Sequence, residues 1–147
     1  MCYHGADLTL QKSGRYPTML LFVYGTLMRG ERNRGDLEVV GAVFQGVHKT
    51  EAGFRMYHHP GDFPAVVAGG DGRIVSGKLW GEVWAVSGEG FEYLDSRERF
   101  CDDTGAPTGL ERMEIQTPYG PAQMYALPTP PEGENMTQIT SGDWRKR

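Results

Sequence analysis

The chain has 147 residues, and its 15 Lys and Arg against 19 Asp and Glu give a formal net charge of −4. This length indicates a single domain, and the mild acidity excludes a general nucleic-acid binder, which needs a face covered by Lys and Arg. The two cysteines form neither a CxxC pair nor a zinc-binding spacing, and no apolar run approaches the ~18 residues that span a bilayer. We therefore expect a cytoplasmic protein without a disulfide framework or a membrane segment.

The first 17 residues show no sustained hydrophobic period, so we expect a loosely held arm ahead of one domain over residues 18–147. Frequent Gly and Pro predict many turns and favour strands over long helices. Alternating or continuously apolar segments predict strands at 19–24, 39–50, 54–58, 63–67, 74–85, 110–117 and 123–127. A helix is predicted over 89–98 with Ser87 as its N-cap, and the basic residues 145–147 are expected to be a solvated tail.

The segment 74–85 has the clearest alternation. Trp80, Glu82 and Trp84 share one face, whereas the other face carries glycines and aliphatic residues. The glycines allow the bending that a closed or strongly coiled sheet requires. Because aromatic rings are costly to leave in water, we predict that both Trp rings contact a cavity wall or a covering helix.

The predicted helix places a carboxylate on its apolar stripe. Phe91, Leu94 and Glu98 fall on one face of a 3.6-residue period. Burial disfavours the charged form of a carboxylate and raises its pKa toward neutrality, as a general base acting on an amine requires. The alternative is that the helix frays at Glu98, whose side chain then pairs with Arg97 or Arg99 in water.

The strand at 19–24 runs into the sequence Tyr24-Gly25-Thr26-Leu27. A glycine directly after a buried strand lets the backbone turn sharply and expose successive N–H groups, and such a nest binds a carboxylate or an oxyanion. An ordinary turn at a strand end has the same pattern, so this motif alone leaves both interpretations open.

Common catalytic and metal-binding motifs are absent from the sequence, which has no GxSxG, P-loop, CxxC, HExxH or GxGxxG. His58 and His59 are adjacent, so in a strand they would point to opposite faces and could not jointly hold a metal. We expect neither a metal nor a cofactor.

Several stretches of the sequence follow one another in a characteristic order. They are FVYGTLMRGERN, a Gly-Asp-Phe-Pro-Ala turn, GKLWGEVW, a Leu-Asp-x-x-Glu helix end and an ERMEIQT/AQMYAL hairpin. In this order, over residues 19–127, the chain resembles the gamma-glutamylcyclotransferase-like family, and most of all its gamma-glutamylamine cyclotransferase type. Gly142-Asp143-Trp144 also looks like the tail of bacterial and phage members.

The resemblance implies an α+β fold, a small mixed β-barrel with flanking short helices around one cavity. It implies that Tyr24, Gly25, Thr26 and Leu27 line the substrate pocket and that Glu98 is the catalytic acid/base. It also implies a lyase-type, cofactor-independent reaction in which a gamma-glutamyl amine or amide releases 5-oxoproline, through attack of its α-amine on its own γ-carbonyl. The expected partner is this small-molecule substrate, with neither nucleic acid nor membrane.

Two other classes of protein remain open. Arg99 follows Glu98 where many relatives have Gly, and Leu110 stands two residues before Arg112 where relatives often carry Tyr. A binding or sequestering protein on the same fold would hold the ligand and return it unchanged. A structural or partner-binding barrel would have no functional cavity, and removal of the Glu98 carboxylate would be neutral or stabilising there.

Overall fold

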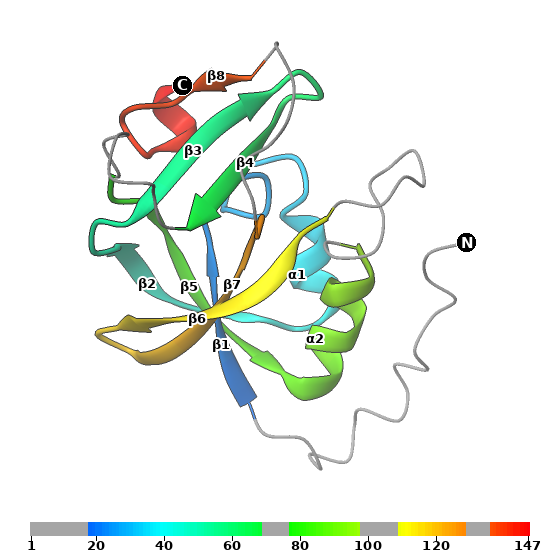
Figure 1. Ribbon diagram of the computed structural model, residues 1–147. Helices are drawn as coiled ribbons and strands as arrows, with labels where there is room; N and C mark the ends of the chain where they lie inside the picture. The colour runs from blue at the N-terminus through cyan, green and yellow to red at the C-terminus, as the bar shows by residue number, and fades with distance from the viewer. Residues whose placement is uncertain (1–17, 69–76, 98–108, 129–135) are drawn as a thin grey trace.

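The computed structural model of the protein describes residues 18–68, 77–97, 109–128 and 136–147 (Figure 1). They form a five-stranded sheet, a three-stranded sheet beside it, and two short helices that lie together on one side of the larger sheet (Figure 1). The predicted N-terminal arm and Glu98 fall outside the described residues. The mixed α+β class predicted from the sequence is confirmed.

The larger sheet follows the apolar segments of the sequence. Its strands are β1 (Thr18–Val23), β2 (Val43–Lys49), β5 (Trp80–Ser87), β6 (Glu111–Thr117) and β7 (Gly120–Ala126). They lie in the order β2-β5-β1-β7-β6, with β1 parallel to β7 and antiparallel to β5. Because β1 is the central strand, Leu21, Phe22 and Val23 are almost wholly buried, as a continuously apolar strand predicts.

The smaller sheet consists of β3 (Phe54–His59), β4 (Phe63–Ala68) and β8 (Thr137–Gln138), in the order β4-β3-β8. The first two strands form a hairpin at the predicted turn, whereas β8 is too short to give a periodic signal in the sequence. An antiparallel bridge between Phe54 and Gly77 and a parallel bridge between Val67 and Leu127 extend hydrogen bonding beyond the named strands.

The helical segments named in the described part of the chain are α1 (Gly35–Val39), α2 (Gly88–Asp95) and a 3-10 helix (Trp144–Lys146). The predicted N-cap is confirmed, because the Ser87 hydroxyl accepts a hydrogen bond from the Gly90 amide at 3.0 Å. Phe91 and Leu94 are buried, as the predicted apolar stripe requires. No helix within the described ranges is long and apolar enough to cross a membrane.

The predicted closed barrel is not found. β2 and β6 are the two edges of the larger sheet, and no backbone pairing joins them in the described part of the chain. The two edges meet through a side chain instead. The hydroxyl of Tyr119, at the tip of the β6–β7 hairpin, lies so close to Gly46 on β2 that an added Cβ there would overlap it. Contact between a ring and a glycine therefore takes the place of the expected strand pairing.

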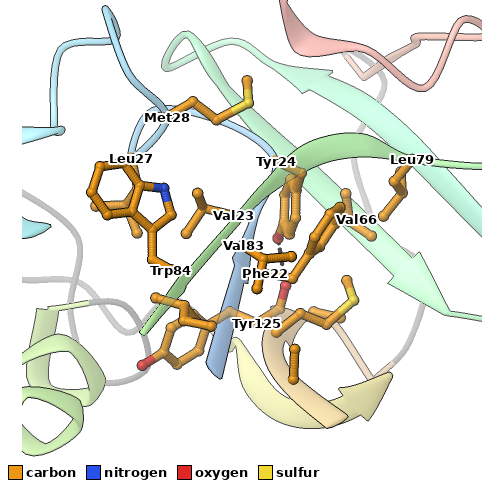
Figure 2. Packing of buried hydrophobic residues seen from close by; sticks show 14 of the residues in the cluster. Phe22, Val23, Tyr24, Leu27, Met28, Val66, Leu79, Val83, Trp84 and Tyr125 are labelled. Carbon is orange, nitrogen blue, oxygen red and sulfur yellow. Dashed lines mark hydrogen bonds between the residues drawn. The ribbon is translucent and has the colours of Figure 1, made fainter. Parts of the chain in front are cut away.

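The two Trp residues of β5 differ in burial. Trp84 is 7% exposed and packs edge-on against Phe44, with ring centroids 5.4 Å apart, within the apolar core that Figure 2 shows. Trp80 is 38% exposed and lies beneath the Lys49 ammonium, 4.9 Å from the ring centroid. Burial, the reason for the prediction, is thus found for Trp84 but not for Trp80, which lies at the beginning of the strand.

The basic residues at the end of the chain are exposed, as their composition predicts, but they also make contacts that the sequence did not indicate. The Arg145 guanidinium donates to the Arg29 carbonyl at 2.5 Å, and Arg147 donates to the Trp144 carbonyl at 2.8 Å. Trp144 itself is buried and packs edge-on against His58. These contacts hold the C-terminal segment against the turn that follows β1.

Candidate active site

The turn after β1 contains the four residues predicted to line a substrate pocket. Tyr24, Gly25 and Leu27 are buried, and Thr26 is half-buried. The Met28 amide donates to the Gly25 carbonyl at 3.0 Å, which closes the turn. Asn33 then binds Thr26 twice, through its backbone amide to the carbonyl at 2.8 Å and through its side-chain amide to the hydroxyl at 3.0 Å. Hydrogen bonds from Met28 and Asn33, which follow the turn, therefore fix its conformation.

Three consecutive backbone N–H groups of this turn have unused donor capacity. The amides of Gly25, Thr26 and Leu27 donate to no acceptor within the described part of the chain. Backbone amides at the end of a buried strand are normally paired, since an unpaired buried donor costs free energy. Successive free amides form the kind of nest that holds a carboxylate or an oxyanion.

Gly25 is required by packing. A Cβ placed on it would lie 2.4 Å from Cγ of Pro64 on β4, which no real side chain tolerates. The backbone of Gly25 does not adopt a left-handed conformation. The glycine therefore permits the close approach of β4 to the turn, and any side chain there would disturb this packing as well as the amides beside it.

A buried carboxylate on β5 anchors the far end of the turn. Glu82 is 1% exposed and lies opposite Val23, the last residue of β1. Its two oxygens accept from the Arg29 backbone amide at 2.9 Å and from Arg29 Nε at 2.8 Å. Trp84 Nε1 donates to the same carboxylate at 3.3 Å, and an Arg145 nitrogen lies 3.7 Å from it.

These contacts determine the charge state of Glu82. Burial opposes ionisation, but the hydrogen bonds from Arg29 and Trp84 outweigh this effect and hold the pKa of Glu82 below its usual value. The carboxylate thus remains charged at neutral pH. Through its pairing with β1 and its hydrogen bonds to Arg29, Glu82 links the strand before the turn to the segment after it.

Tyr125 on β7 links the turn to the end of α2. The Tyr24 hydroxyl donates to the Tyr125 carbonyl at 2.5 Å, a hydrogen bond drawn in Figure 2. The Tyr125 hydroxyl donates to Asp95 at 2.7 Å, and Arg112 Nε lies 3.4 Å from the same oxygen of Asp95. The predicted catalytic Glu98 follows three residues after Asp95, beyond the described residues. These hydrogen bonds therefore link the turn after β1 to Asp95, in the segment that precedes Glu98.

No metal site emerges among the described residues, where no three His, Cys, Asp or Glu side chains converge. His58 binds Asp62 at 2.9 Å, and His59 stacks on Phe63 with ring centroids 4.1 Å apart. Both histidines lie at the end of β3, beside the β3–β4 turn.

Comparison with known proteins identifies the family. The chain matches the family described as "Gamma-glutamyl cyclotransferase, AIG2-like" over residues 21–146, and it belongs to this family. A gamma-glutamylcyclotransferase family protein of Citrobacter rodentium is 30% identical over 132 residues, which cover 88% of this chain and 97% of that protein. The resemblance inferred from the sequence is thus confirmed.

Solved structures agree at the level of the fold. A crystal structure of a Pyrococcus horikoshii protein superposes with a TM-score of 0.67 at 30% identity, covering 87% of this chain and 91% of the other. The structure of an AIG2-like protein from Mus musculus gives a TM-score of 0.56 at 21% identity, covering 80% of each chain. This second likeness supports the fold alone.

Sequence reasoning missed Arg29, Glu82 and Tyr125. Glu82 carried a signal, because a single carboxylate between Gly81 and Val83 in a strand is costly to bury unless a cation meets it. Its partner, however, lies 53 residues away in the chain. Tyr125 occupies an alternating apolar strand and has no local pattern that distinguishes it from a core residue.

Proposed function

We propose that the protein is a gamma-glutamylcyclotransferase that releases 5-oxoproline from a gamma-glutamyl amine or amide. The observation that carries the proposal is the row of three free amides at Gly25, Thr26 and Leu27, in a turn fixed at both ends. Family membership supports the same reaction class. The free amides would bind the α-carboxylate or the carbonyl oxygen of a glutamyl group.

The reaction needs one group that accepts and returns protons. The α-amine of the glutamyl group attacks its own γ-carbonyl, so a ring C–N bond forms and the amide C–N bond to the leaving amine breaks. The α-ammonium loses two protons in becoming the ring N–H, and the departing nitrogen gains two to leave as an ammonium. We assign this proton transfer to Glu98, which acts first as a base and then as an acid.

Positioning would supply much of the rate. The nucleophile and the electrophile belong to one molecule, and well-oriented intramolecular reactions reach effective molarities on the order of 10⁵ M or more. A pocket that holds the glutamyl chain folded therefore needs few catalytic groups. The Glu82–Arg29 pair and the Tyr24–Tyr125 hydrogen bond would keep the turn rigid for this purpose.

The test is an assay of 5-oxoproline with a panel of gamma-glutamyl amines that differ in the amine half. Glu98→Gln keeps the side-chain shape but cannot accept a proton, so kcat should fall by about 10²- to 10⁴-fold. Glu92→Gln is the matched control, because Glu92 is an exposed residue of α2 in the same segment of chain. Its turnover should equal that of the wild type.

Two outcomes would overturn the proposal. Wild-type turnover in Glu98→Gln would remove the assignment of the acid/base. If no member of the panel yields 5-oxoproline but several bind and are recovered unchanged, the protein sequesters its ligand. Isothermal titration with the same panel separates this case from a protein that binds none of them.

A further inference from the structure

A cavity lies away from the turn after β1. Its volume is about 360 Å³, within the usual range of small-molecule sites, and it lies between β3, residues 77–79 and residues 138–142. None of the residues at 24–27 lines it. One wall is held by backbone contacts, because the Trp80 amide donates to the Gly142 carbonyl at 2.9 Å and an added Cβ at Gly142 would overlap the Lys78 carbonyl oxygen.

Arg55 of β3 lines this cavity and is buried, with 6% of its surface exposed. Its Nη1 donates to the Tyr57 hydroxyl at 2.9 Å. Its Nε is buried and has no hydrogen-bond partner, and within the described ranges Nη2 has none either. Nε and Nη2 form one edge of the planar guanidinium, the edge that a carboxylate binds with both oxygens.

The described residues that line the cavity provide no compensating charge. Arg55 and Lys78 are the cations among them, none of them is an Asp or Glu, and no ion pair in the described part of the chain includes either cation. A buried cation is costly unless an anion or several acceptors meet it. Four apolar residues also line the cavity, namely Phe54, Met56, Leu79 and Ile139.

We propose that this cavity is a binding site for a small organic carboxylate with an apolar chain. The carboxylate would bind the free edge of Arg55, with Lys78 as a second cation at the exposed side of the site. The chain of the ligand would pack against the apolar wall. Because none of the residues at 24–27 lines this cavity, the proposal stands or falls independently of the cyclotransferase reaction.

The experiment is isothermal titration of the full-length protein with hexanoate, butyrate, acetate and inorganic phosphate at matched ionic strength. We expect hexanoate to bind most tightly, and acetate and phosphate most weakly, since only the longer chains reach the apolar wall. Arg55→Gln should weaken hexanoate binding at least about tenfold, because a charge-assisted bidentate contact is lost. The hexanoate affinity of Arg55→Lys should lie between those of the wild type and Arg55→Gln, since lysine keeps the charge without the planar edge.

Arg34→Gln is the matched control, because Arg34 is an exposed arginine at the N-cap of α1 that pairs with Glu38. Hexanoate affinity should be unchanged there. Lys78→Gln, at an exposed position, keeps the test available if the Arg55 variants do not fold, and it should weaken hexanoate binding a few-fold. Equal binding of all four anions, or a hexanoate affinity that none of the Arg55 and Lys78 variants changes, would overturn the proposal.

Discussion

Glu82 and Arg55 are both buried charges, but they differ in how many of their hydrogen bonds are made. The carboxylate of Glu82 accepts from two groups of Arg29 and from Trp84. The guanidinium of Arg55 makes one hydrogen bond, to Tyr57, and its Nε has no partner. A buried charge whose hydrogen bonds are complete stabilises the fold. A buried charge with unused donors destabilises it until a ligand supplies acceptors.

The surroundings of the two charges explain this difference. Glu82 lies opposite the last residue of β1, at the point where the chain must turn and where Arg29 returns to it. The pair therefore fixes a turn. Arg55 lies on β3, beside a cavity whose described lining residues include no anion. We infer that the first charge positions a site and that the second is part of one.

The largest expected effect comes from replacing Arg29 with Met. This change leaves the Glu82 carboxylate buried without its main partner and should lower the free energy of unfolding by about 2–3 kcal/mol. The figure lies below the ~3–5 kcal/mol of a fully buried pair because Arg29 is 49% exposed and its backbone amide still donates. Urea unfolding measures it.

The same substitution at Arg55 should not lower the free energy of unfolding. Arg55→Met removes an unpaired buried cation and should leave the unfolding free energy unchanged or raise it, in buffer free of organic carboxylates. Equal destabilisation by the two substitutions would show that Arg55 has a structural role, and the distinction between the two charges would then fail.

The pH dependence of stability tests the Glu82 half of the comparison. Because its pKa is lower in the folded than in the unfolded chain, the ionised carboxylate stabilises the fold above its ordinary pKa of 4.5. This contribution is lost as the pH falls through the folded pKa. The difference in unfolding free energy between wild type and Glu82→Gln should therefore be constant near neutrality and shrink below about pH 4.5.

A second carboxylate with a lowered pKa, that of Asp62, acts as an internal reference. A hydrogen bond from His58 and the nearby Arg147 lower the pKa of Asp62, which is exposed on the β3–β4 turn. Asp62 is present in both proteins, so its titration cancels in the difference. A gap between wild type and Glu82→Gln that stays the same from pH 7 to pH 3 would contradict the assigned role of Glu82.

A smaller effect is expected at Tyr125. Tyr125→Phe removes the hydroxyl that donates to Asp95 but keeps the carbonyl that accepts from Tyr24. The loss should be about 1 kcal/mol of unfolding free energy. If the link from the turn to the end of α2 positions the catalytic segment, kcat should also fall more than KM changes.

Tyr119→Phe provides the control for this prediction, since Tyr119 is an exposed tyrosine at the tip of the β6–β7 hairpin. Stability and turnover should both be unchanged there. A Tyr125→Phe variant that loses stability but keeps full turnover would limit Tyr125 to a structural role.

Local features of the fold were predictable from the sequence, whereas long-range pairings were not. The apolar run of β1, the Ser87 cap and the turn after β3 depend on neighbouring residues, and each is found as predicted. The exposed ring of Trp80 and the open edges of the larger sheet depend on which strands meet, which alternation does not determine.

The site shows the same division. The turn at 24–27 was predicted from a glycine after a buried strand, and its free amides support that prediction. The ion pair of Glu82 with Arg29 and the contact of Arg145 with Arg29 join segments 53 and 116 residues apart. The sequence indicated the exposure of the C-terminal arginines but not the contact of Arg145, because no local pattern indicates a distant partner.

The smallest effect is expected at Arg34, which completes a series of three arginines in different surroundings. Arg34 Nη1 lies 2.6 Å from the Glu38 carboxylate, but both side chains are about half exposed. Water screens such a pair, so Arg34→Gln should change the unfolding free energy by less than about 0.5 kcal/mol, and 1 M salt should remove even that. Arg29 keeps a buried partner, so its larger contribution should survive the same salt. If Arg34→Gln and Arg29→Met lost equal stability in 1 M salt, burial of the partner would not be what separates these charges.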